Sequence, residues 1–230
     1  MKRAWFLFLL GTLVFDGAVA GEELFLSRKR MVEEQLHRRG IRDERLLKAM
    51  ERLPRELFVP PALRGRAYED GPLPIGEGQT ISQPYIVAAM TELLELDGTE
   101  KVLEVGTGSG YQAVILGELA KEVYTIEILP GLAREAQTRL RQLGAQNIEV
   151  KIGDGYLGWA EHAPFDAILL TAAPEEVPQT LLDQLKEGGI LVAPLGPSTD
   201  QTLWRFRKRD GKIDREEIIP VRFVPMVHGK

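Results

Sequence analysis

The segment from Lys101 to Gly110 constrains the fold of this chain more than any other stretch of its sequence. Five largely apolar, β-prone residues, Lys101–Val105, lead into the run Gly106-Thr107-Gly108-Ser109-Gly110. A short apolar run bounded by glycines is typical of a strand buried on both faces of a parallel sheet. Glycines allow a tight turn that brings the backbone close to a ligand, and a helix after the turn offers free N–H groups. The segment therefore predicts a strand, a ligand-binding turn and a helix.

The spacing of these glycines favours one kind of nucleotide site over another. A dinucleotide fingerprint has glycine or alanine at the sixth position of Gly-x-Gly-x-x-Gly, where this chain has Tyr111. The run Gly-x-Gly-x-Gly after the acidic Glu104 instead resembles motif I of S-adenosylmethionine-dependent methyltransferases. A Gly-rich turn between a strand and a helix also occurs with a purely structural role, so this motif alone leaves both interpretations open.

The chain from Lys101 onward alternates between strand-like and helix-like segments. Strands are predicted at 101–105, 122–127, 148–152, 165–170 and 190–194, and helices at 110–120, 130–143 and 178–186. Such alternation indicates an α/β fold with a doubly wound, mostly parallel sheet, similar to that of S-adenosylmethionine-dependent methyltransferases. Residues 202–207 and 217–224 flank the turn Asp210-Gly211 and predict antiparallel strands at the C-terminus.

The segment before the sheet divides into a helical part and a Gly- and Pro-rich part. Residues 25–63 are predicted to be helical, with Val32, Leu36 and Ile41 on one stripe, Asp43 as the cap of a second helix, and Pro54 as its end. Residues 71–84 lack periodicity and predict a long, functional loop. Pro84 suits the first turn of another helix, whose buried face would comprise Ile86, Met90, Leu93 and Leu94. We expect a helical region at 21–70 and a methyltransferase domain at 71–230.

The first twenty residues have the layout of a secretory signal peptide. Lys2 and Arg3 precede an apolar run over residues 4–15, and Ala18-Val19-Ala20 fits the small-x-small cleavage rule. The apolar run is short for a membrane span, so no stable membrane insertion is expected. This N-terminus predicts export to the periplasm, whereas S-adenosylmethionine is made in the cytoplasm, so the localisation stays open between the two.

Composition excludes several kinds of site. The chain has 230 residues and a net charge of −5, which does not suggest a nucleic-acid partner. It has no cysteine, so disulfides, thiolate metal sites and a cysteine nucleophile are excluded. His37, His162 and His228 are scattered without metal-ligand spacing, and no metal site is predicted.

Acidic residues follow two consecutive predicted strands. Glu127 ends the second strand, where a carboxylate can accept both ribose hydroxyls, and Asp154 follows the third, where it can accept an adenine amino group. Ligands of open parallel sheets lie beyond the carboxyl ends of the strands. Glu104 lies inside a buried strand and either braces the glycine turn or faces the ammonium group of the ligand. The predicted cosubstrate-binding residues are Glu104, Gly106, Thr107, Gly108, Ser109, Gly110, Glu127, Asp154 and Gly155.

Several motifs together resemble protein-L-isoaspartate O-methyltransferases over residues 25 to the C-terminus. They are Pro54–Val59, Gly78-Gln79-Thr80-Ile81-Ser82-Gln83-Pro84, Val102–Gln112, Gly153-Asp154-Gly155, Phe165–Ile168, Gly188–Leu191 and Val221-Arg222-Phe223-Val224-Pro225. The segment Thr80–Pro84 is the most specific to this family, whereas many methyltransferases share the glycine motif. The chain departs from the family pattern in its N-terminal extension and its short tail after Pro225.

The resemblance implies a protein repair enzyme. It would move a methyl group from S-adenosyl-L-methionine to the α-carboxyl of L-isoaspartyl residues in damaged proteins or peptides. By the same likeness Ser82 is the catalytic residue, and Thr80, Ile81, Gln83, Val221 and Phe223 contact the peptide. A carboxylate with a pKa of ~4 is already ionised near neutrality, so no general base or metal is needed. Ser82 then positions the acceptor by a hydrogen bond, although a helix N-cap before Pro84 would also explain this serine.

Other functions remain open from the sequence alone. A methyltransferase acting on a small molecule would have the same cosubstrate half. A non-catalytic exported binding protein would account for the signal-like N-terminus. A nicotinamide-dependent dehydrogenase would use a similar sheet, but Tyr111 and Asp154 count against it. We expect a monomer.

Overall fold

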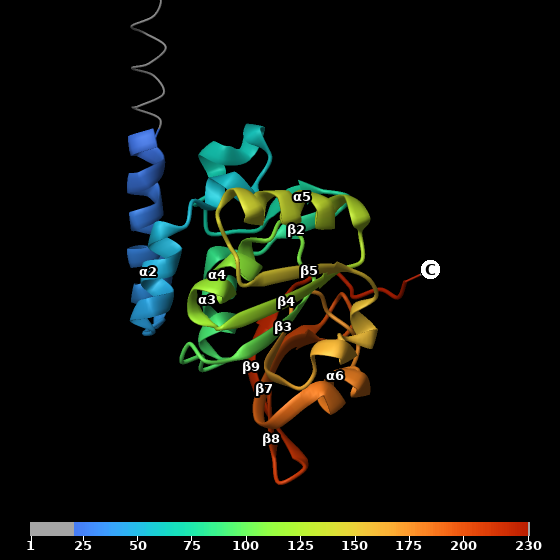
Figure 1. The fold of residues 1–230 in the computed structure, drawn as a ribbon. Coiled ribbons are helices and arrows are strands. Elements are labelled where there is room, and N and C mark those ends of the chain that lie inside the picture. The colour runs from blue at the N-terminus through green and yellow to red at the C-terminus, as the bar shows by residue number, and fades with distance from the viewer. Residues whose placement is uncertain (1–20, 230) are drawn as a thin grey trace, which may run out of the picture.

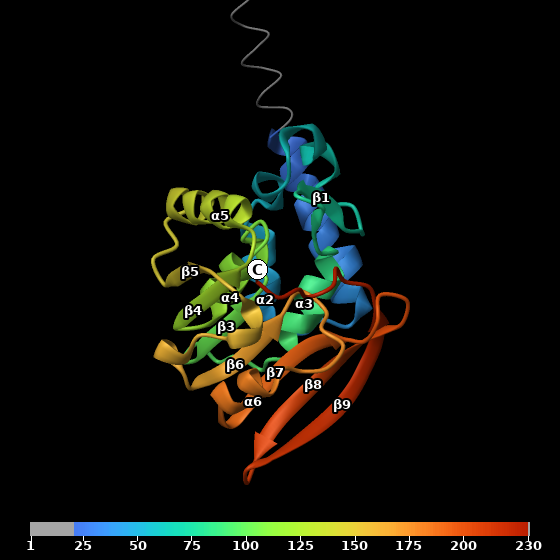
Figure 2. The ribbon, with the colours of Figure 1, turned by 90° about the vertical axis from the view of Figure 1, so that its right-hand side faces the viewer.

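The computed structural model describes residues 21–229 (Figures 1 and 2), and the predicted signal peptide lies outside the described residues. A seven-stranded sheet has the strand order β5-β4-β3-β6-β7-β8-β9. Its strands are β3 (Lys101–Val105), β4 (Glu122–Glu127), β5 (Ile148–Ile152), β6 (Phe165–Leu170), β7 (Leu185–Leu195), β8 (Gln201–Arg209) and β9 (Lys212–Val221). Strands β3 to β7 pair in parallel, whereas β7, β8 and β9 pair antiparallel. The predicted fold class, with its antiparallel C-terminal strands, is confirmed.

The order of the strands reverses at β3. Strand β3 pairs with β4 on one side and with β6 on the other, so connections leave it in both directions. In open parallel sheets this reversal opens a crevice beyond the carboxyl ends of the strands. The glycine turn predicted to bind a ligand follows β3 directly, and therefore lies at this crevice.

Helices cover both faces of the sheet because its strands are apolar on both sides. Val102 belongs to one buried cluster and its neighbour Leu103 to another, and Leu169 and Leu170 of β6 divide in the same way. The helices are α2 (Glu44–Arg52), α3 (Pro84–Glu92), α4 (Tyr111–Leu119), α5 (Pro130–Gln142) and α6 (Gln179–Gln184). Helices α2, α3 and α4 lie on one side of the sheet in Figure 1, and α6 lies on the other. None of the helices described over residues 21–229 is long and apolar enough to cross a membrane.

The N-terminal region is helical, as predicted. Residues 21–30 continue into a π-helical turn, Met31–Leu36, and the 3-10 turn His37–Arg39 precedes α2. Asp43 caps α2, since its carboxylate accepts hydrogen bonds from the backbone N–H groups of Arg45 and Leu46 at 2.8 and 3.2 Å. Two further 3-10 turns, Arg55–Phe58 and Pro61–Arg66, follow α2. The predicted stripe of Val32, Leu36 and Ile41 is buried.

The prediction of a loop over residues 71–84 is wrong in one respect. Two short strands, β1 (Leu73–Gly76) and β2 (Gln79–Ile81), form an antiparallel hairpin there. Its turn contains Glu77, which adopts a positive φ of 48°. Strands this short have too few residues to show an alternating pattern, so the sequence carries no periodic signal for them.

Other element predictions also differ from the structure, and β9 spans Lys212–Val221 rather than residues 217–224. Strand β7 begins at Leu185 rather than residue 190, and α6 is correspondingly shorter than predicted. The buried face of α3 includes Val87 and Ala88, whereas Ile86 is only half-buried. This helix is apolar nearly all round, so its sequence alone did not distinguish the buried face.

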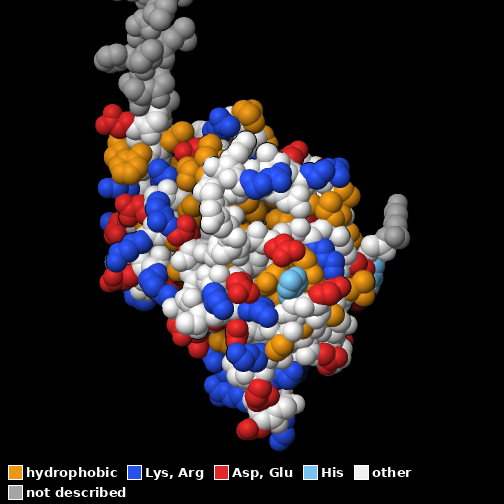
Figure 3. All heavy atoms as spheres, viewed as in Figure 1, with side chains coloured by type: hydrophobic (Ala, Val, Ile, Leu, Met, Phe, Trp, Pro, Cys, Tyr) orange, Lys and Arg blue, Asp and Glu red, His pale blue; other side chains and the backbone are white. Residues whose placement is uncertain are grey.

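Basic side chains gather around the β8–β9 hairpin, at the lower end of the molecule in Figure 3. Arg205 forms ion pairs with Glu95 and Glu216, and Arg207 pairs with Glu95. Exposed ion pairs of this kind contribute little to stability, but they offset much of the local positive charge.

Candidate active site

The turn after β3 is held from two sides. The Gly106 amide donates to the Ile126 carbonyl of β4 at 2.8 Å, and the Thr171 hydroxyl after β6 donates to the Gly106 carbonyl at 2.6 Å. Gly106 and Gly110 have φ values of 104° and 87°, which residues with a side chain rarely adopt. The glycines are therefore needed for the path of the turn itself.

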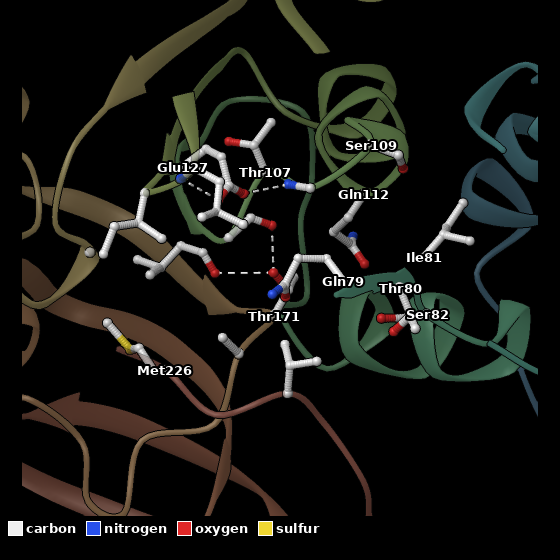
Figure 4. Close-up of a pocket in the computed structure, with 18 of the residues that line it drawn as sticks. Gln79, Thr80, Ile81, Ser82, Thr107, Ser109, Gln112, Glu127, Thr171 and Met226 are labelled. Carbon is white, nitrogen blue, oxygen red and sulfur yellow. Dashed lines mark hydrogen bonds between the residues drawn. The ribbon is translucent and has the colours of Figure 1, made fainter. Parts of the chain in front are cut away.

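A cavity opens over this turn, at the carboxyl ends of β3, β4 and β6 (Figure 4). Several parts of the chain supply its lining: strand β2 with Ser82, helix α3, the glycine turn with the start of α4, the ends of β4 and β6, Gly155 and the C-terminal segment. The lining residues are Gln79–Ser82, Val87, Val105–Ser109, Tyr111, Gln112, Ile126–Leu129, Gly155, Thr171, Ala172 and Val224–Val227.

Glu127 is fixed at the wall of this cavity. Its Oε2 atom accepts a hydrogen bond from the Gly108 amide at 2.8 Å, and Oε1 accepts one from the Leu129 amide at 3.0 Å (Figure 4). The side chain is 6% exposed. A carboxylate held by two backbone amides keeps lone pairs free for hydroxyl donors, which matches the predicted ribose contact.

Glu104 lies beneath the turn and does not line the cavity. It is fully buried, and its Oε2 atom accepts a 2.5 Å hydrogen bond from Thr125, whose hydroxyl lies 2.6 Å from that of Thr107. Burial raises the pKa of Glu104 to about 8. This chain of contacts braces the glycine turn from below. A direct contact of Glu104 with the cosubstrate stays a prediction.

Asp154 is engaged by the C-terminal segment. Its Oδ1 atom accepts a hydrogen bond from the Tyr156 amide at 2.8 Å, and Oδ2 accepts one from the Gly229 amide at 3.0 Å. The His228 ring stacks on Tyr156 at 3.8 Å between centroids. Although burial opposes it, the bonds from Gly229 and Tyr156 hold the pKa of Asp154 below its usual value. Gly155 lines the cavity, and the adenine contact of Asp154 stays a prediction.

A second cavity adjoins the first. It is lined by Pro72, Thr80, Ser82, Gln83, Ile86, Thr171 and Pro220–Val224. Thr80, Ser82, Thr171 and Val224 belong to both linings. Ser82 therefore stands where the two cavities meet, and Figure 4 shows its hydroxyl near that of Thr80.

Most of the predicted site residues line one or both of these cavities, whereas Glu104, Gly110 and Asp154 line neither. Those in the first are Thr80, Ile81, Ser82, Gly106, Thr107, Gly108, Ser109, Glu127 and Gly155, whereas Gln83, Val221 and Phe223 line the second. Gly110 ends the turn and lies against α5, where a Cβ would contact Ala136 at 3.4 Å. The structure thus brings residues 80–83 and 221–223 together from distant parts of the chain. Their individual roles stay predictions.

Several lining residues are not among the predicted site residues, and Gln79, Gln112 and Met226 are examples. Gln112 lies in the first turn of α4, and its side chain donates to the Thr91 hydroxyl at 2.8 Å. Thr171 directly follows β6 and lines the cavity, as expected for a residue at the carboxyl end of a parallel strand. Among residues 21–229, no group of three or more His, Cys, Asp or Glu side chains is placed to hold a metal ion.

Comparisons with known proteins agree with this geometry. The family model of protein-L-isoaspartate(D-aspartate) O-methyltransferase matches residues 26–230. The protein-L-isoaspartate O-methyltransferase of Geobacter metallireducens is 55% identical over 203 residues, which are 88% of this chain and 94% of that protein. The corresponding protein of Yersinia enterocolitica is 55% identical over 196 residues, covering 85% of this chain and 94% of the relative.

Solved structures show the same likeness. A protein-L-isoaspartate O-methyltransferase superposes with a TM-score of 0.78 and 31% identity, over 86% of this chain and 65% of that one. A Plasmodium falciparum protein described as a protein-L-isoaspartate O-methyltransferase, in complex with S-adenosyl-L-homocysteine, gives a TM-score of 0.76 and 26% identity, over 87% and 98% of the two chains. On the strength of the matched family model and these relatives, the chain belongs to the protein-L-isoaspartate(D-aspartate) O-methyltransferase family.

Proposed function

We propose that this protein methylates the α-carboxyl of L-isoaspartyl residues in damaged proteins and peptides, with S-adenosyl-L-methionine as the methyl donor. The observation that carries the proposal is the position of Ser82 at the junction of two cavities. One cavity has the features of a nucleoside site, and the other is bounded by chain segments that suit a peptide. Methyl transfer needs a donor and an acceptor to meet at one point, and Ser82 marks that point.

The first cavity fits S-adenosyl-L-methionine by the chemistry of its donors and acceptors. Glu127 would hold the ribose, Asp154 and Gly155 the adenine side, and the turn Gly106–Gly110 the amino-acid part. When bound, S-adenosyl-L-methionine supplies a methyl group made electrophilic by a sulfonium. Buried apolar residues in the lining, such as Val105 and Ile126, would help to keep water from the reacting atoms.

The second cavity suits a polypeptide in an extended conformation. One wall is formed by Pro220–Val224, which comprises the end of the edge strand β9 and the residues after it, and Gln83 and Ile86 form another. An extended backbone next to a sheet edge offers hydrogen-bonding groups to a peptide. A small-molecule acceptor would need no such groove, so this cavity favours a peptide acceptor over a small molecule.

Ser82 acts as a positioning group at the acceptor carboxylate. A carboxylate of pKa ~4 is ionised near neutrality, so its oxygen can take the methyl group without a base to remove a proton. The Ser82 hydroxyl can donate to one carboxylate oxygen and leave the other aligned for the transfer. Orientation in a dry site then supplies the catalytic advantage.

The experiment compares an isoaspartyl peptide with a peptide of the same sequence that contains normal aspartate, using labelled S-adenosyl-L-methionine and the purified protein. We expect methylation of the isoaspartyl peptide alone. Ser82→Ala should lower kcat about 10- to 100-fold while S-adenosyl-L-homocysteine still binds as in the wild type. Equal methylation of both peptides would contradict the proposal. Binding of S-adenosyl-L-homocysteine without any transfer would instead indicate a non-catalytic binding protein.

The localisation and the oligomeric state form a separate part of the proposal. The signal-like N-terminus argues for export to the periplasm, and the cytoplasmic supply of methyl donor argues for the cytoplasm. Mass spectrometry of the mature N-terminus separates the two, because an exported chain begins at Gly21. We propose a monomer without stable membrane insertion. Light scattering on the purified protein tests the former and membrane fractionation the latter.

A further inference from the structure

Arg55 is a buried cation that has no role in the site as described above. Its side chain has 0% exposure, and no carboxylate pairs with it among residues 21–229. Burial lowers the pKa of Arg55 to about 10, so the guanidinium is still charged near neutrality. A buried charge without a charged partner is costly for folding, and groups with a strongly shifted pKa cluster at functional sites.

The contacts of Arg55 lead directly to the proposed point of transfer. Its Nη2 atom donates to the carbonyl oxygen of Ser82 at 2.8 Å, and its Nε atom donates to the Ala67 carbonyl at 2.8 Å. The guanidinium carbon lies 4.9 Å from the centroid of the Tyr111 ring, which lines the first cavity. Arg55 thus underlies two cavity residues at once.

Unused hydrogen-bonding capacity remains in the same place. Within the described chain, the Nη1 atom of Arg55 and the hydroxyl of Tyr111 are buried without a hydrogen-bond partner. The nearby carboxylate of Glu56 is engaged by the Tyr68 hydroxyl, and Arg28 is the other cation of this neighbourhood. The region behind Ser82 therefore carries a net positive charge.

We propose that Arg55 is a positioning residue for the acceptor carboxylate: it holds Ser82 in place through the Ser82 carbonyl, and its buried charge favours an anionic occupant beside that serine. This inference rests on the proposed function. Because the interior has a low effective dielectric, a cation acts over a longer range there than at the surface. The charge of Arg55 would favour binding of the ionised carboxylate that accepts the methyl group over neutral groups of the same shape.

The experiment measures the affinity of two peptides by calorimetry, in the presence of saturating S-adenosyl-L-homocysteine. One peptide carries isoaspartate, and the other carries isoasparagine, its neutral isostere. Arg55→Met should weaken the isoaspartyl peptide about tenfold and change the isoasparaginyl peptide and S-adenosyl-L-homocysteine less than twofold. Arg55→Gln, which keeps a donor for Ser82 without the charge, should behave in the same way. Arg55→Lys, which keeps the charge, should retain the preference for isoaspartate.

Arg28→Met is the matched control. Arg28 lies in the same neighbourhood, but its Nη1 atom donates to the Arg52 carbonyl rather than to Ser82. Because Arg28 is partly exposed to solvent, which screens its charge, Arg28→Met should change the preference between the two peptides far less than Arg55→Met does. Equal weakening of both peptides by the neutral Arg55 variants, or no weakening, would overturn the inference, as would loss of the preference in Arg55→Lys. The two proposals can fail separately. If the wild type methylates the isoaspartyl peptide and the neutral Arg55 variants still prefer that peptide, the proposed function stands and only the role of Arg55 is contradicted.

Discussion

Thr171 occupies the space that a side chain at residue 106 would need. A Cβ atom on Gly106 would lie 2.3 Å from the Thr171 Oγ1 atom, and φ at Gly106 is 104°. The hydroxyl of Thr171 lies 2.6 Å from the Gly106 carbonyl oxygen and 3.1 Å from that of Val105, and it would lose its hydrogen bond if it rotated away. The end of β6 thus sets the shape of the turn that follows β3.

Gly106→Ala should therefore abolish measurable binding of S-adenosyl-L-homocysteine and destabilise the protein by about 2–4 kcal/mol. Gly144→Ala is the control, because Gly144 has a φ of 73° but nothing within 4 Å of its Cβ position. It should cost only about 1 kcal/mol and leave binding unchanged. Calorimetry and urea denaturation measure both effects. Similar losses in the two variants would show that backbone strain, and not Thr171, constrains residue 106.

Glu127→Gln should weaken S-adenosyl-L-homocysteine about 10- to 100-fold. The substitution removes the charge. It also replaces one acceptor oxygen by an N–H₂ group, which would face the backbone N–H of Gly108 or Leu129 and could not accept its hydrogen bond. Glu122→Gln, at the start of the same strand and remote from the cavity lining, is the control. Calorimetric titration gives both affinities. A Glu127→Gln variant with wild-type affinity would rule out the ribose contact.

Glu104 should make the stability of the protein fall as the pH rises through the range from about 4.5 to 8. Its pKa is raised from 4.5 to about 8 in the folded protein, so the folded state keeps a proton that the unfolded state has already lost in this range. The contribution of Glu104 to the free energy of unfolding is therefore fully present below pH 4.5, the pKa in the unfolded state. It is lost as the pH rises to about 8, the pKa in the folded state. Glu104→Gln removes the titration but keeps an acceptor for Thr125.

Urea denaturation at several pH values tests this prediction. Between pH 5 and 8 the wild type should lose stability relative to Glu104→Gln, by an amount on the order of a few kcal/mol. Parallel pH profiles of the two proteins would contradict the raised pKa.

Removal of residues 228–230 should raise the affinity for S-adenosyl-L-homocysteine by up to about tenfold. The Gly229 amide donates to Asp154 Oδ2, the acceptor predicted for the adenine amino group, and one such hydrogen bond has a net value of about 1 kcal/mol. His228→Ala keeps the backbone bond and serves as the control, with little expected change. A truncated protein with unchanged affinity would mean that the tail and the nucleoside do not compete for Asp154.

Local elements of this protein could be predicted because their signals lie in contiguous residues. The segment Lys101–Val105 forms β3 with the predicted bounds, and Asp43 caps α2 through its own neighbours along the chain. The run Gly106–Gly110, in which three glycines adopt a positive φ, is also recognisable from neighbouring residues alone. Strand and helix propensity, capping and turn chemistry act over a few residues, so the order of elements and the fold class follow from them.

Contacts between distant segments required the folded chain. Ser82 and Val224 line the same two cavities although 142 positions of sequence separate them, and no periodic pattern links them. The bond from Arg55 to Ser82, the Glu104–Thr125–Thr107 chain and the tail at Asp154 likewise join separate elements. Side-chain hydrogen bonds depend on distances of about 3 Å that arise only when packing brings elements together. The type of chemistry could thus be inferred from motifs. The residues that position the site by hydrogen bonds could be identified only from the folded structure.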